Sequence, residues 1–167
     1  MTGWFTRLGA PLDDDERAGV SRMLRALDFP PAAEIASIGS WAGVGAALRA
    51  DDRDSRAWDA EEAERERLWA AAAERMPESE LLAALNDGNR RLREAIQVAA
   101  AAAAARSGME DASMIAAAAG AALLAVHQQH LATLAGAGDA HYFQHKFRLF
   151  AGGRWPLGLC DGRFVVF

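Results

Sequence analysis

The sequence predicts a mainly α-helical single domain, with a multi-helix bundle over residues 1–153 and a short C-terminal β-hairpin over residues 154–167. Three observations support this prediction. Several segments repeat large apolar residues at helical spacing, alanine is abundant, and an Asp-Gly pair near the C-terminus separates two apolar runs. A chain of 167 residues is long enough for one sizeable core and too short for two ordinary domains.

The first expected helix begins at the acidic cluster Asp13–Glu16 and runs to about Leu27. An aspartate accepts hydrogen bonds from the free amides of a first turn, and negative charge suits the positive end of the helix dipole. Pro30-Pro31 ends this helix. Proline also suits the first turn of a helix, so a short helix is expected over Ala32–Ile38.

Two further helices are expected before the middle of the chain. Ser40 is a suitable cap for a short helix that carries Trp41, Val44 and Leu48 on one side. The charged break Asp51–Asp54 then separates it from a long, solvated helix over Ser55–Met76, which is rich in Glu and Arg.

Residues 77–106 are expected to form two helical pieces. Pro77 interrupts the preceding helix, helix resumes over Glu78–Leu85, and Asn86-Asp87-Gly88-Asn89 predicts a turn before the helix Arg90–Arg106. The seven consecutive alanines Ala99–Ala105 favour a helix and leave room for a neighbouring backbone. We therefore expect them to form a tight packing face.

The next helix, Asp111 to about Ala135, is apolar nearly all round as far as Val126, which predicts a position in the middle of the bundle. Asp139 is expected to cap a shorter helix that ends at Phe150. The hairpin follows, with strands Leu157–Cys160 and Arg163–Phe167 around Asp161-Gly162. Because Arg163–Phe167 is apolar on both faces, we expect this strand to be buried within the monomer. The alternative is that its free edge or its last aromatic residue contacts another chain.

Composition excludes several classes of function. The net charge is -5, with 17 acidic against 10 basic residues in positions 1–80, so the basic excess of a nucleic-acid-binding protein is missing. The longest apolar runs are shorter than the roughly 18–20 residues of a membrane span, and the first residues lack the pattern of a signal peptide. The single cysteine, Cys160, predicts a reduced, cytosolic protein without an intramolecular disulfide.

All four histidines fall within 19 residues, on two consecutive expected helices: His127, His130, His141 and His145. Imidazole is a common ligand of Zn, Ni, Fe and Cu. One hypothesis is therefore a divalent transition-metal site, built from all four or from two histidines and Asp139. The other is a purely structural role, in which His127 and His130 point into the bundle, away from Gln128 and Gln129, while His141 and His145 face water.

No catalytic motif is found, and the acidic surface favours electrostatic recognition of a basic partner. We therefore expect a non-enzymatic cytosolic interaction protein of the adaptor, regulator or toxin-neutralising immunity type, with no cofactor. Its partner is expected to be another protein or a second copy of the chain, and neither nucleic acid nor membrane. The alternative is a metal-binding helical protein, either a sensor or a metal-dependent enzyme. The residues expected to contact a partner are Glu61, Glu62, Glu64, Glu66, Arg90, Arg91 and Arg93.

Overall fold

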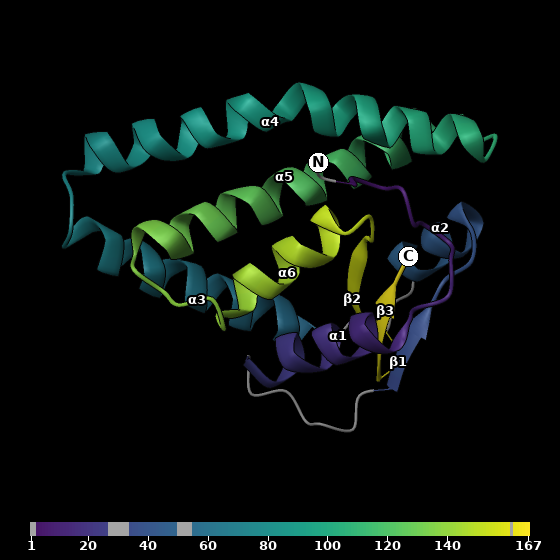
Figure 1. Cartoon of the computed structure of the whole chain (residues 1–167), viewed down its shortest axis with the longest axis horizontal. Coiled ribbons are helices and arrows are strands. Elements are labelled where there is room, and N and C mark those ends of the chain that lie inside the picture. The colour runs from purple at the N-terminus through teal and green to yellow at the C-terminus, as the bar shows by residue number, and fades with distance from the viewer. Residues whose placement is uncertain (1–2, 27–33, 50–54, 161) are drawn as a thin grey trace.

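The structure is a computed structural model that describes residues 3–26, 34–49, 55–160 and 162–167. It is mainly helical with short C-terminal strands, as the sequence predicts (Figure 1). The elements over the described residues are α1 (Asp14–Ala26), β1 (Glu34–Ser37), α2 (Trp41–Arg49), α3 (Ser55–Ala73), α4 (Glu78–Arg106), α5 (Ala112–Leu134), α6 (Tyr142–Ala151), β2 (Pro156–Cys160) and β3 (Arg163–Val166).

The alanine tract forms the packing face that its composition predicts. In Figure 1, α4 lies along α5 for most of its length. Ala100, Ala103 and Ala104 of α4 are buried in the same core cluster as Ala118 and Ala122 of α5. Small side chains let the two backbones approach closely, so the long helical hairpin needs few large residues at this contact.

The turn predicted at Asn86–Asn89 is wrong, because α4 is one continuous helix of 29 residues. Asp87 forms ion pairs with Arg90 and Arg91 one turn further on, which supports helix instead of a turn. Gly88 is needed for packing, since a Cβ at this position would overlap the imidazole of His130 on α5.

The predicted hairpin is present, and it belongs to a three-stranded sheet of order β1-β3-β2. The central strand β3 is antiparallel to β2 and parallel to β1. Phe164 and Val166 lie in one core cluster, while Val165 and Phe167 lie in the other. This placement explains why the last five residues are apolar on both faces, and it confirms their burial within the monomer. Asp161 of the predicted turn lies outside the described residues.

The expected helix at Ala32–Ile38 is wrong, because Glu34–Ser37 forms β1. Each of its four residues pairs with one residue of β3, from Glu34 with Arg163 to Ser37 with Val166. The partner strand is more than a hundred residues away in sequence, so local composition does not reveal the pairing. The start of that expected helix, and the charged break at Asp51–Asp54, lie outside the described residues.

A buried arginine joins the start of the chain to the segment before β2. Arg154 is 1% exposed, and its guanidinium donates to both carboxylate oxygens of Glu16 at 2.7 Å. It also donates to the backbone carbonyls of Arg7, Ala10 and Pro11. These contacts fix the N-terminal segment against the core. Over the described residues, no helix has the length and hydropathy needed to cross a membrane.

Candidate functional site

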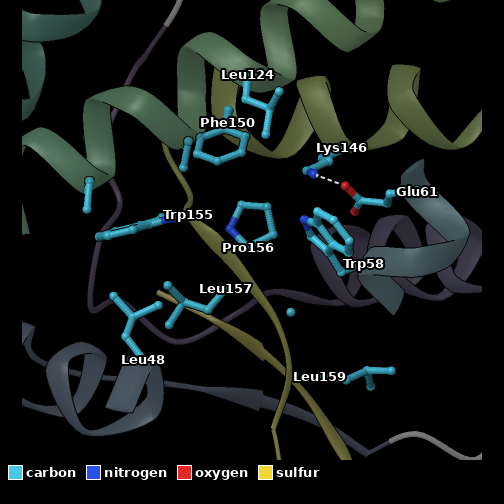
Figure 2. A pocket seen from close by; sticks show the side chains of 13 residues that line it. Leu48, Trp58, Glu61, Leu124, Lys146, Phe150, Trp155, Pro156, Leu157 and Leu159 are labelled. Atoms are coloured by element: carbon cyan, nitrogen blue, oxygen red, sulfur yellow. Dashed lines mark hydrogen bonds and ion pairs between the residues drawn. The ribbon is translucent and has the colours of Figure 1, made fainter. Parts of the chain in front are cut away.

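A mainly apolar hollow of about 280 Å³ lies between α3, α5, α6 and β2. Figure 2 shows Trp155, Leu157 and Leu48 toward one end, with Trp58 beside the Glu61–Lys146 pair toward the other. Its walls therefore come from elements that are far apart in the sequence and meet only in the folded chain.

The floor of the hollow follows the edge of the sheet. Five consecutive residues, Trp155–Leu159, line it, although successive side chains of a strand point to opposite faces. The hollow therefore runs along the outer edge of β2, which is the terminal strand of the sheet. Pro156 suits this position because a proline lacks the amide hydrogen that an inner strand needs.

Two large apolar side chains at the rim of the hollow are exposed to solvent. Trp58 of α3 is 66% exposed and Leu124 of α5 is 47% exposed, and both line the hollow. The other two large apolar side chains that are exposed in the described part of the chain, Leu82 and Val98, lie on α4 and do not line it. Two of the four large apolar side chains exposed in the described residues thus lie at this one depression.

One wall carries a polar cluster centred on Glu61. Lys146 forms an ion pair with Glu61 at 2.6 Å, and both side chains are mostly buried. The Tyr142 hydroxyl donates to the other carboxylate oxygen, and Gln128 Nε2 donates to Glu61 at 3.3 Å. Burial, and then the charge of Glu61, raises the pKa of Tyr142 well above 10, which keeps the hydroxyl protonated as a donor.

A second carboxylate one turn along α3 links to the start of α6. Glu64 accepts from His141 Nε2 at 2.6 Å and from Arg67. The hydrogen bond from Arg67, followed by that from His141, lowers the pKa of Glu64 despite its partial burial. His141 Nδ1 accepts from the amide of Phe143, so His141 caps α6, a role expected of Asp139. Glu61 and Glu64 therefore join α3 to α6.

The predicted acidic surface is accordingly smaller than the sequence indicates. Glu61 and Glu64 are held by contacts within the chain, and Glu62 pairs with Arg65 on α3. Glu66 is exposed, as is Asp59 beside Trp58, and neither forms an ion pair with another described side chain.

The predicted arginine cluster is at the surface of α4, and it is not at a helix N-terminus as expected. Arg90, Arg91 and Arg93 are exposed in the middle of the continuous helix, and the first two pair with Asp87. The structure does not place this cluster at the hollow, because none of the three arginines lines it.

The structure separates the predicted histidines into different surroundings. His127 contacts Asn89 of α4, and burial, followed by the charge of Arg65, lowers its pKa below 6.5. His130 packs against Gly88. Burial, and then the charge of Arg148, lowers the pKa of His145.

Two orientation predictions are wrong. The His141 side chain is only 14% exposed, and Gln128 is buried. Asp139, the proposed additional ligand, is 94% exposed and lies beside Arg148. Within the described ranges, no three His, Cys, Asp or Glu side chains are grouped so that they could hold a metal ion.

Sequence reasoning missed the hollow and its polar wall. Lys146 is the only lysine of the chain and stands four residues after Tyr142, which places both on one side of α6. That pair was the one available signal. Comparison of the chain with protein-family models, curated proteins and solved structures found no match.

Proposed function

We propose that this chain is a non-enzymatic interaction protein of the cytosol, an adaptor, regulator or toxin-neutralising protein, and that the hollow is its binding face. The observation that carries the proposal is the position of Trp58 and Leu124, which are exposed at the rim of one apolar depression. Exposed apolar groups gathered at one place are typical of protein interfaces, and aromatic anchors dominate their energetics. Cys160, a buried free thiol, is consistent with a reducing compartment.

The exposed carboxylates of α3 favour a basic partner. Asp59 is exposed next to Trp58, Glu66 is exposed further along α3, and the chain carries a net charge of -5. A second copy of the chain binding through the same face would bring one acidic α3 toward another, because a two-fold contact uses the same patch on both copies. A different protein with basic residues meets this face without that repulsion.

A matched pair of leucines tests the location of the binding face. Leu124 and Leu82 are 47% and 44% exposed, and only Leu124 lines the hollow. We would immobilise the wild type, Leu124→Asp and Leu82→Asp and capture proteins from lysate of the native host at low salt. The expected result is a captured protein that is lost with Leu124→Asp, kept with Leu82→Asp and released by high salt.

Equal capture by the two leucine variants would contradict the proposal, as would a partner that high salt leaves bound. Both substitutions are on exposed helix surface, so their effects on folding should be similar and small. Circular dichroism of each bait checks this before the comparison.

A further inference from the structure

We propose that the hollow receives one aromatic side chain of the partner, flanked by basic residues, and that Lys146 donates a hydrogen bond to a backbone carbonyl beside it. This inference rests on the proposed function and specifies the chemistry of the occupant. The size of the hollow, the donors in its wall and the exposed carboxylate of Asp59 on α3 support it.

The size of the hollow suits a single large side chain. Its volume of about 280 Å³ is roughly twice the 150 Å³ of an apolar protein cavity that holds benzene. It is also at the lower limit of the roughly 300–1,000 Å³ typical of pockets for larger ligands. Apolar walls from Leu124, Phe150 and Leu157 surround most of this space. An indole or phenyl ring is the side chain that gains most from entering it.

The polar wall offers donors. Glu61 already accepts from Tyr142, Lys146 and Gln128, so its two oxygens are largely occupied. An ammonium group has three N–H donors, and Glu61 takes one from Lys146. The remaining donors of Lys146 are available to an acceptor that enters the hollow, which this side chain lines.

Charge then decides which acceptor fits. The ion pair with Glu61 largely neutralises Lys146, and an entering carboxylate would lie near the carboxylate of Glu61 as well as near the ammonium. A neutral carbonyl makes the same hydrogen bond without that repulsion. The exposed carboxylate of Asp59, next to Trp58 in the sequence, favours positive residues on either side of the aromatic anchor.

The test uses N-acetyl-L-tryptophanamide as a neutral aromatic probe that carries backbone-like carbonyls. Because Lys146 is the only lysine, labelling lysine with carbon-13 gives one Cε signal in an NMR titration. We expect this signal and the Leu124 methyl signals to shift saturably with the probe. N-acetylglycinamide, which lacks the ring, should leave them unchanged, and the anionic N-acetyl-L-tryptophan should bind about fivefold more weakly.

Variants of the hollow provide the controls. Ala121→Phe, which fills the hollow from α5, should abolish probe binding, and Ala117→Leu is a smaller filling variant if the first does not fold. Lys146→Met should weaken binding about threefold to tenfold, whereas Lys146→Arg, which keeps donors and charge, should retain most of it. In the Lys146 variants the Leu124 methyl signals report binding.

Several outcomes would overturn the inference: no saturable shift, binding that both filling variants leave intact, or tighter binding of the anionic probe. If the probe fails while Leu124→Asp still abolishes partner capture, the aromatic anchor is refuted and the binding face stands. If the probe binds as expected but both leucine variants capture partners equally, the proposed function fails, and with it the assignment of a protein as occupant.

Discussion

Replacing Arg154 by methionine should cause one of the larger losses of stability available to a single substitution in this chain. The guanidinium is 1% exposed and donates to Glu16 and to three backbone carbonyls. Methionine keeps the apolar stem and removes every donor. Breaking a buried pair in this way typically costs about 3–5 kcal/mol, because the partner groups lose their donors and stay buried.

The lower end of that range is expected, because Glu16 keeps an ion pair with Arg7 at 2.9 Å and is 12% exposed. A loss of about 3 kcal/mol lowers the melting temperature of a domain of this size by roughly 6–12 °C. Thermal and urea unfolding, followed by circular dichroism, measure the change.

The matched control is Arg148→Met. Arg148 is 52% exposed and lies 3.5 Å from Asp139, which is 94% exposed, so its loss should cost less than about 1 kcal/mol. Equal stabilities of the two variants would refute the reasoning.

Burial alone would raise the pKa of Glu16, but hydrogen bonds from Arg154 and from the Asp13 amide lower it below 4.5. As the pH falls below about 4.5, Glu16 is protonated in the unfolded chain before it is protonated in the folded chain. The stability that Glu16 contributes to the wild type should therefore be lost at acidic pH.

Four further predictions concern packing, pH and the C-terminal strand. Gly88→Ala should destabilise the protein by about 1–3 kcal/mol through overlap with His130, and His130→Ala in the same chain should relieve the loss. Gly120→Ala, where the added Cβ meets nothing within 4 Å, should instead stabilise it by about 0.5–1 kcal/mol in urea unfolding. Burial lowers the pKa of His127 in the folded chain, so below about pH 6.5 the unfolded chain binds a proton first. The free energy of unfolding should therefore decrease as the pH falls below this value, and His127→Asn should remove part of this pH dependence. Deleting Arg163–Phe167 removes the central strand of the sheet, and with it roughly 6–12 kcal/mol of apolar burial before entropy is subtracted. Cooperative unfolding should therefore be lost. An unchanged melting curve would contradict this prediction.

Structural features that depend on residues close together in the sequence could be predicted from it. An aspartate caps α1 as expected, with Asp13 Oδ1 accepting from the Glu16 amide, and Glu16 in turn accepts from the Asp13 amide. Asp111 caps α5, and the alanine tract is buried against that helix. The apolar tail Arg163–Phe167 correctly indicated a buried strand.

Features that depend on distant contacts could not be predicted. The segment Glu34–Ser37 forms a strand that pairs with β3, and Asn86–Asn89 lies within α4, where Gly88 packs against His130 of α5. The candidate site has the same origin. Glu61 and Lys146 are 85 positions apart, and the carboxylates of α3 that predict a solvated acidic face are partly turned toward α6. Charge counts along a helix do not show which of its faces is covered.

The most direct test of the central claim, that the hollow is the binding face, is site-specific photocrosslinking in the native host. A benzophenone amino acid would replace Leu124 in one strain and Leu82 in another, two positions of similar exposure of which only Leu124 lines the hollow. The account predicts a crosslinked partner from position 124 and none from position 82. A crosslink from position 82 alone, or equal crosslinking from both, would contradict it.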